Sequence, residues 1–213
     1  MELPDRWQVN FADRSDGAKP EVKLFHTRDQ EIEWLVDRIR LLIDTEDVRP
    51  EDVLVLFDKL ALLRESKEFT TIPSKIRERI PNVANVIEPH GRSDNPSKDR
   101  YIFEEDALTV TTVQSAKGYD SAIVFVIGAD LFPTDTEGRA SFYVAASRSK
   151  MHLFATGFRG SVNLAEEAYA VARLLDTPAS ASTRSIESGL AGGFQIDSAW
   201  KIVSCVYTGE VRS

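Results

Sequence analysis

Short apolar runs alternate along this chain with longer segments in which apolar residues recur every three or four positions. The runs are too short for typical helices and rich in strand-forming residues, as expected of strands covered on both faces. They lie at 52–58, 107–113, 121–128 and 151–157, and an alternating run lies at 21–27. Helical periodicity follows residue 27 and recurs at about 59–67, 139–149 and 163–175. Strands that alternate with helices predict an α/β fold with a mostly parallel sheet and helices on its faces.

The first helix has the clearest local signals. Thr27 followed by Gln30 has the spacing of a capping box at a helix N-terminus. Apolar residues then recur at helical spacing from Ile32 to Leu42, which predicts a stripe that packs against the sheet. Acidic side chains in the first turns place negative charge near the positive end of the helix dipole.

The same patterns divide the chain into four parts. Residues 1–20 are a polar lead-in with no periodicity, and 21–177 form the α/β domain, interrupted by a polar loop at 90–100. A stretch rich in Ser, Ala and Gly at 178–193 has the composition of a linker. Residues 194–213 are a C-terminal extension, for which a hairpin is the expected structure.

Composition argues against several classes of protein, namely secreted proteins, membrane proteins and proteins with a broad basic surface. With 213 residues, 42% of them hydrophobic, the chain is long enough for one domain with a substantial core. The single cysteine, Cys205, cannot form an internal disulfide, and the polar N-terminus lacks the apolar core of a secretory signal, so a cytoplasmic protein is expected. No run approaches the roughly 18–20 apolar residues that span a bilayer, so no membrane role is expected. The net charge of -8 argues against a broad basic surface for nucleic acid, so any DNA contact is expected to be local or shared with another domain.

A nucleotide-hydrolysing P-loop is missing from the sequence. Such a loop needs Gly-x-x-x-x-Gly-Lys-Ser/Thr, because backbone amides cradle the phosphates while the lysine and the hydroxyl complete the site with Mg²⁺. None of the 11 glycines is followed by lysine, and no Asp-Glu pair ends a predicted strand. We therefore expect no complete ATPase site, no metal site and no tightly bound cofactor in this chain alone.

Residues 111–128 (TTVQSAKGYDSAIVFVIG) carry a more specific signal, in which a strand, a Ser-Ala-Lys-Gly turn, an acidic residue and a second buried strand follow one another. This segment resembles motif V of UvrD/Rep-type superfamily 1 helicases, commonly Thr-x-His-x-Ala-Lys-Gly-Leu-Glu before a hydrophobic strand. The family's Thr, His, Lys, Gly and Glu positions are occupied here by Thr112, Gln114, Lys117, Gly118 and Asp120.

The resemblance implies a role for each of these residues. In the family the acidic residue reaches the nucleotide sugar and the Thr/His side of the motif faces single-stranded DNA. The resemblance thus implies nucleotide binding by Asp120 with Lys117 and Gly118, and DNA binding by Thr112 and Gln114. Two departures matter: aspartate is one methylene shorter than glutamate, so a water-mediated contact to the ribose is expected, and glutamine can bond to DNA but cannot titrate as histidine does.

Residues 138–157 (GRASFYVAASRSKMHLFATG) are similar to motif VI of the same family, commonly Arg-x-x-x-Tyr-Val-x-x-Thr-Arg-Ala before a Leu-rich strand. The matching positions hold Arg139, Tyr143, Val144, Ser147 and Arg148. By this resemblance Arg148 is the catalytic arginine finger that meets the γ-phosphate held by another domain, and Arg139 and Tyr143 contribute to nucleotide binding. The family's motif IV is not found in the N-terminal part, so its arginine is expected upstream in a longer chain.

The two motifs occur in the order and with the flanking strands that the family has, and a looser similarity extends back to about residue 21. The resemblance therefore implies a RecA-like, P-loop-NTPase-type three-layer fold that lacks the P-loop itself, acting as the second motor domain of a superfamily 1 DNA helicase. It implies three partners: an N-terminal RecA-like domain with Walker A and B motifs, single-stranded DNA, and ATP with Mg²⁺ in the complete motor. Translocation polarity and the choice between DNA and RNA stay open.

Two other functions remain. One is a stand-alone RecA-like module that binds DNA or protein without catalysis. The other is a small-molecule α/β enzyme, such as a receiver whose phosphorylated aspartate would be Asp58 at a strand end, although no acidic pair ends the preceding strand. The histidines, which are His26, His90 and His152, lack metal-ligand spacing. The tryptophans, which are Trp7, Trp34 and Trp200, are interpreted as packing residues.

Overall fold

The computed structural model describes residues 19–80, 85–87, 107–160 and 163–176. The predicted loop at 90–100, the linker at 178–193 and the C-terminal extension at 194–213 lie outside the described residues, as does the lead-in apart from its last two residues. Within the described part, none of the helices is long and apolar enough to cross a bilayer.

Six strands form one sheet in the order β1-β6-β5-β2-β4-β3, and every neighbouring pair is parallel. The strands are β1 (Glu21–Phe25), β2 (Val53–Phe57), β3 (Asn85–Ile87), β4 (Ala107–Thr112), β5 (Ser121–Val126) and β6 (Ser149–Phe158). Every residue of β2 is buried, as the unbroken apolar run at its position predicts for a central strand. The parallel pairing means that all strands begin at one edge of the sheet and end at the other.

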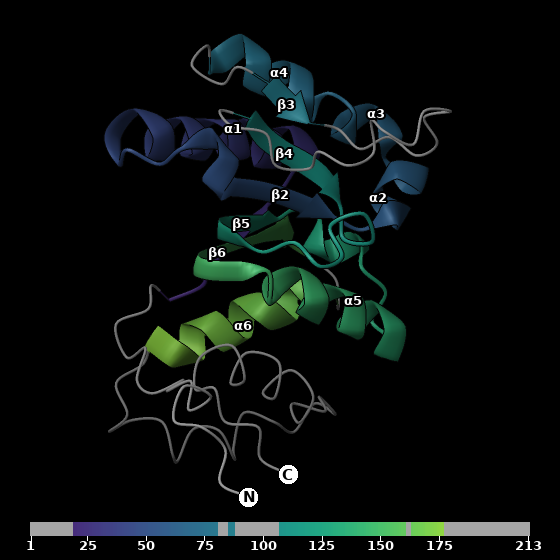
Figure 1. The fold of residues 1–213 in the computed structure, drawn as a ribbon. Coiled ribbons are helices and arrows are strands. Elements are labelled where there is room, and N and C mark those ends of the chain that lie inside the picture. Colours follow the sequence, from purple (N-terminus) through teal and green to yellow (C-terminus); the bar gives the residue numbers. More distant parts are fainter. Residues whose placement is uncertain (1–18, 81–84, 88–106, 161–162, 177–213) are drawn as a thin grey trace, which may run out of the picture.

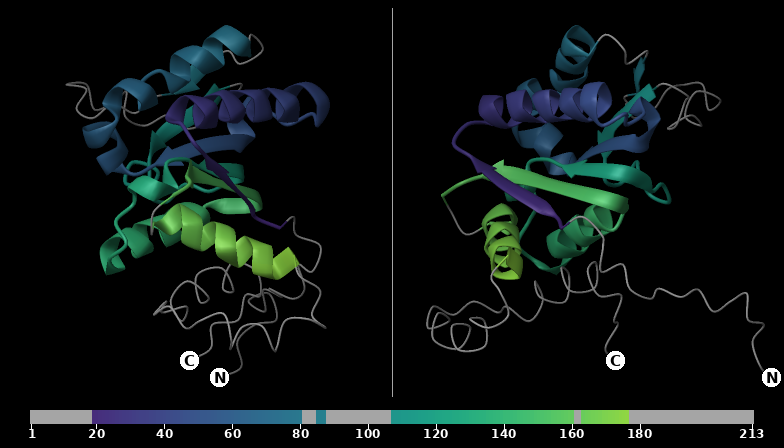
Figure 2. Two further views of the ribbon diagram at one scale, coloured as in Figure 1. Left: turned by 180° about the vertical axis from the view of Figure 1, so that it is seen from behind. Right: turned by 90° about the vertical axis from the view of Figure 1, so that its left-hand side faces the viewer.

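Helices cover both faces of this sheet (Figure 1), and two further views show the same three layers (Figure 2). The first helical layer consists of α1 (Arg28–Thr45), α2 (Lys59–Arg64), α3 (Ser66–Phe69) and α4 (Ile72–Arg79). The second consists of α5 (Thr136–Ala146) and α6 (Leu164–Asp176). The predicted α/β class, with a parallel sheet between layers of helices, is confirmed.

Helix α1 follows its local signals closely. Thr27 Oγ1 accepts a hydrogen bond from the backbone amide of Gln30 at 3.2 Å, so the predicted cap is formed. Its apolar stripe, from Ile32 to Leu42, is buried against the sheet. Trp34 on the same helix lies 5.7 Å from the ring of Phe25 between centroids and contacts two further core rings, which confirms its packing role.

Other boundaries differ from the sequence prediction. Helix α5 begins three residues before the expected residue 139, because the Asp135 side chain accepts a hydrogen bond from Gly138 N at 2.8 Å and caps the helix there. The single helix expected at about 59–67 is divided into α2 and α3. Strand β3 has three residues and was not predicted, since so short a segment carries no measurable periodicity.

Candidate functional site

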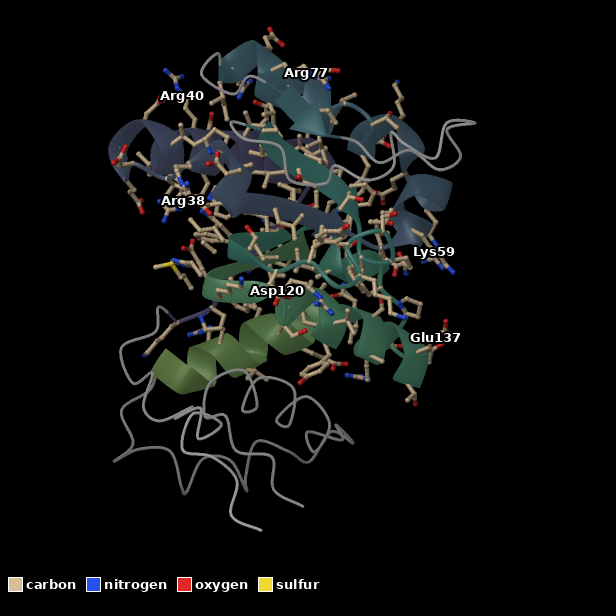
Figure 3. The ribbon with its side chains drawn as sticks, viewed as in Figure 1. Arg38, Arg40, Lys59, Arg77, Asp120 and Glu137 are labelled. Carbon is tan, nitrogen blue, oxygen red and sulfur yellow. The ribbon has the colours of Figure 1, made fainter. Side chains whose placement is uncertain are left out.

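The residues singled out by the two motifs lie at opposite edges of the sheet. Thr112 ends β4 and is paired in register with Phe57 at the end of β2. Asp120 and Arg148 instead precede β5 and β6, whose first residues are register partners. In Figure 3, Lys59, which lies just after β2, and Glu137, in the first turn of α5, lie on the right, and Asp120 lies to their left. Ligands of parallel α/β sheets usually bind at the carboxyl edge, whereas Asp120 and Arg148 lie at the amino edge.

Backbone contacts hold the two amino-edge residues together. Helix α5 ends at Ala146, and the hydroxyl of Ser147 donates to the carbonyl of Val144 at 2.9 Å. The carbonyl oxygen of Arg148 then accepts a hydrogen bond from Ser121 N at 2.9 Å, directly after Asp120. The last turn of α5 and the start of β5 are thereby fixed side by side.

The side chains complete the contact, because Arg148 Nη1 donates to Asp120 Oδ1 at 3.0 Å. Their side chains are 21% and 44% exposed, so this is a partly solvated pair of the kind that contributes only about 0–1 kcal/mol. Arg148 Nε is buried and has no hydrogen-bond partner among the described residues. A guanidinium held by one weak pair, with a donor left unsatisfied, is well suited to exchange its partner for an anionic ligand.

Arg139 has a different environment. Its Nε donates to the carbonyl of Thr134 at 2.9 Å, and Nη1 and Nη2 donate to the two carboxylate oxygens of Glu167 at 2.5 and 2.8 Å. The hydrogen bond with Glu167 is the main reason that the pKa of Arg139 is raised above its ordinary value. This bidentate pair joins α5 to α6, so the contacts of Arg139 indicate a structural role in holding the two helices together. Its predicted contact with nucleotide stays a prediction.

The remaining nucleotide candidates are exposed, and Tyr143 lies one helical turn after Arg139 on α5. Tyr143 on α5 is 39% exposed, and Lys117 is also exposed. Gly118 has a φ of +91°, a conformation that favours glycine, and open space where a Cβ would lie. Arg139 and Arg148 are nine positions apart, mostly within α5, which amounts to about 13 Å along a helix. The structure therefore brings together Asp120 and Arg148 and leaves Arg139 apart.

The carboxyl edge of the sheet holds a second set of polar side chains, and the sequence did not predict that they lie together. Asp58 follows β2 and is only 3% exposed. Its Oδ2 accepts hydrogen bonds from Gln114 Nε2 at 3.4 Å and from Ser141 Oγ at 3.2 Å. Thr112 Oγ1 lies 3.1 Å from the hydroxyl of Ser115 and accepts from its backbone amide at 3.3 Å. The predicted DNA-binding residues Thr112 and Gln114 are thus neighbours of a buried carboxylate.

A buried ionic cluster, which the sequence did not predict, lies at the carboxyl ends of β5 and β6. Arg28 is 5% exposed and forms ion pairs with Glu31, with Glu65 at 2.6 Å and with Asp130 at 2.9 Å. We call these four residues the Arg28 cluster. Burial alone would lower the pKa of Arg28, but the charges and hydrogen bonds of the carboxylates raise it. The cluster ties the start of α1 to the segments that follow β2 and β5.

Glu31 is the most deeply buried member of the Arg28 cluster. Its Oε1 accepts from Gly128 N at 2.9 Å and from Thr156 Oγ1 at 2.5 Å, and its other oxygen bonds to Arg28. Burial raises the pKa of Glu31, and these contacts oppose that rise only in part. Its signal in the sequence is weak, because an acidic residue in the first turns of a helix is usually interpreted as a surface charge on the helix dipole.

Among the described residues, the titratable groups form no metal-binding arrangement. Within the described ranges, no group of three or more His, Cys, Asp or Glu side chains is arranged to hold a metal ion. His152 stacks on Phe154 with 4.2 Å between ring centroids, and burial, with the nearby charge of Arg38, lowers its pKa. His152 is therefore a packing residue on the strand, while His90 lies outside the described residues.

Comparisons with known proteins find a loosely similar solved structure and no matching family. No protein-family model matches the chain, and no curated protein matches it. Among solved structures, the C-terminal domain of a possible DNA helicase from Lactobacillus plantarum is similar, with 17% sequence identity and a TM-score of 0.48 over 67% of this chain and 75% of that one. This likeness is loose, and the α/β fold described above rests on the strand pairing itself.

Proposed function

We propose that this chain is the second RecA-like motor domain of an ATP-dependent superfamily 1 DNA helicase of the UvrD/Rep type, and that it supplies half of an ATP site. The observation that carries the proposal is the pairing of Asp120 with Arg148 at 3.0 Å. The sequence resemblance assigns Asp120 to motif V and Arg148 to motif VI, and these two residues are 28 positions apart in the sequence. Their contact places both residues at one edge of the sheet, where a single bound nucleotide could reach them.

The chemistry of the pair fits ATP. The guanidinium of Arg148, whose buried Nε has no hydrogen-bond partner among the described residues, carries the planar set of donors that a γ-phosphate accepts. Asp120 offers carboxylate oxygens to the hydroxyl groups of a ribose. Bound ATP with Mg²⁺ supplies the phosphoanhydride bond that water cleaves, and the first motor domain would hold its phosphates and the ion. This chain's contribution is to stabilise the charge that develops on the transferred phosphate.

The opposite edge of the sheet is the proposed contact for single-stranded DNA. Gln114 is exposed there, two residues after Thr112 at the end of β4. Because both edges belong to one packed sheet, closure of the amino edge onto an ATP-bound first domain would also move the DNA-binding edge. We propose that cycles of closure and opening advance the strand.

The test is substitution of Arg148 in a complete motor that contains this chain. Arg148→Ala should leave ATP binding nearly unchanged but lower kcat by about 10³- to 10⁵-fold, equivalent to about 4–7 kcal/mol of transition-state stabilisation. Arg148→Lys should restore little, because an ammonium cannot reproduce the two-pronged geometry of a guanidinium. The 213-residue chain alone should show no ATP turnover, since it lacks the phosphate cradle.

Arg139→Ala is the matched control, because Arg139 lies on α5, which ends just before Arg148, but bonds to Glu167. If Arg148→Ala turned over ATP within a few-fold of the parent while Arg139→Ala did not, the finger would be Arg139. If neither change affected turnover, the chain would be a binding module without catalysis. DNA-stimulated turnover by the purified 213-residue chain would contradict the half-site altogether.

A further inference from the structure

Asp58 receives one hydrogen bond from each of the two motif segments. The donor from residues 111–128 is the side-chain amide of Gln114, and the donor from residues 138–157 is the hydroxyl of Ser141. Both bonds end on the same carboxylate oxygen, and Asp58 is 3% exposed. The carboxylate therefore joins the loop after β4 to helix α5 at the carboxyl edge of the sheet.

This contact determines which way the amide of Gln114 faces. An ionised carboxylate accepts hydrogen bonds and cannot donate one, whereas a primary amide has a donating nitrogen and an accepting oxygen. The nitrogen therefore lies toward Asp58, as the hydrogen bond shows, because the reverse orientation would set two acceptor oxygens against each other in a buried contact. No hydrogen bond to Gln114 Oε1 is found in the described part of the chain, and the residue is exposed.

We infer that Asp58 is a positioning residue that presents the amide oxygen of Gln114 to single-stranded DNA, so that this oxygen contacts N–H donors of the bases rather than phosphates. The inference rests on the proposed DNA-binding function. Phosphate oxygens have no hydrogen to donate, so they cannot bond to Oε1. Exocyclic amino groups of adenine and cytosine are donors of the required kind.

The positioning is tested first, without DNA, on the 213-residue chain. Proton–nitrogen NMR spectra resolve side-chain amide groups, and the Gln114 signals are identified by their loss in Gln114→Ala. Asp58→Asn keeps the shape of the side chain but removes the carboxylate, and it should move the Gln114 signals toward those of a solvated glutamine. Asp52→Asn, directly before the same strand, is the control and should leave them in place. Gln114 signals that do not respond to Asp58→Asn would overturn the inference.

The contact with bases is tested with two probes of equal length and charge: an oligonucleotide of 12 deoxycytidines and a 12-residue chain of abasic sites. The measured quantity is the ratio of their dissociation constants, from NMR titration. One hydrogen bond to a base implies that Gln114→Ala lowers this preference for deoxycytidine by about 3- to 10-fold. Asp58→Asn should lower it in the same direction, and Asp52→Asn should keep it within about twofold of the parent.

Three outcomes separate this inference from the proposed function. A lower preference in both Gln114→Ala and Asp58→Asn supports it. Equal weakening of both probes by Gln114→Ala would show a phosphate contact and overturn it. If the parent chain bound neither probe while its Gln114 signals still depended on Asp58, the proposed DNA-binding function would fail and, with it, the base contact, although Asp58 would still position the amide.

Discussion

Replacing Arg28 with alanine removes the cation around which three carboxylates gather. The change leaves the side chains of Glu31 and Asp130, which are 1% and 8% exposed, without their positive partner. Removing one member of a buried ion pair typically costs about 3–5 kcal/mol, since the remaining charge stays desolvated. With a urea dependence of about 2 kcal/mol per molar for a domain of this size, the unfolding midpoint should fall by about 1.5–2.5 M.

The control for this prediction lies on the same helix. Arg40 is 59% exposed and pairs with Asp44 one turn away at 3.2 Å, so Arg40→Ala should cost no more than about 0.5 kcal/mol. Arg28→Met separates charge from packing, because methionine keeps apolar contact with the rings of Phe69 and Phe158, which lie 5.1 and 4.1 Å from the guanidinium carbon. Arg28→Met should remain nearly as unstable as Arg28→Ala if the orphaned carboxylates dominate.

The pH dependence gives this prediction a second check. Burial raises the pKa of Glu31 above 4.5, and Arg28 opposes that rise, so Arg28→Ala should raise it further. A carboxyl group whose pKa is higher in the folded state binds more protons when folded, so its contribution to stability falls as pH rises from about 4.5 to the folded-state pKa. The deficit of Arg28→Ala relative to the parent should therefore be smaller at pH 5 than at pH 8. Equal losses in Arg28→Ala and Arg40→Ala, or a deficit that grows on acidification, would refute the reasoning.

Three further predictions follow from the other contacts. Arg139→Ala should lower the free energy of unfolding by about 1–2 kcal/mol through loss of its charged hydrogen bonds, whereas Arg148→Ala should change it by less than about 0.5 kcal/mol; thermal unfolding of the two variants compares them. Gly138→Ala should cost about 1–3 kcal/mol or more, since a Cβ would lie 2.0 Å from the carbonyl oxygen of Pro133, while Gly118→Ala, in open space at positive φ, should cost about 1 kcal/mol in urea unfolding. Binding of single-stranded DNA by the 213-residue chain should be weak and fall steeply with salt, given its net charge of -8, and submicromolar, salt-insensitive binding would contradict this.

Several features of this protein were determined by the sequence alone, because their physical causes are local. The cap of α1 depends on Thr27 and on an amide three residues away, and the burial of β2 follows from an unbroken run of apolar side chains. The α/β class follows from the alternation of such runs with helical periodicity. Helix α5 began earlier than expected because periodicity defines the middle of a helix, whereas a single capping side chain, here Asp135, sets its first turn.

The grouping of the candidate residues was decided by tertiary structure. The sequence resemblance assigned Asp120, Arg139 and Arg148 to one nucleotide site, but the parallel register of β5 and β6 joins Asp120 to Arg148, and Arg139 is bonded to Glu167 of α6. A motif states which residue types occur in which order. It does not state which edge of a sheet they occupy, since that depends on how the strands pair.

The buried charges also depend on the fold. Arg28 forms hydrogen bonds with Glu65 and Asp130, which are 37 and 102 positions away in the sequence. Asp58 accepts hydrogen bonds from Gln114 and Ser141, which are 56 and 83 positions away. In the sequence each of these residues has the pattern of a solvated surface group, because hydrophobic periodicity reports only the environment of nearby positions. Whether a charge is buried and paired is fixed by the order of strands in the sheet, which brings distant partners together and excludes water from between them.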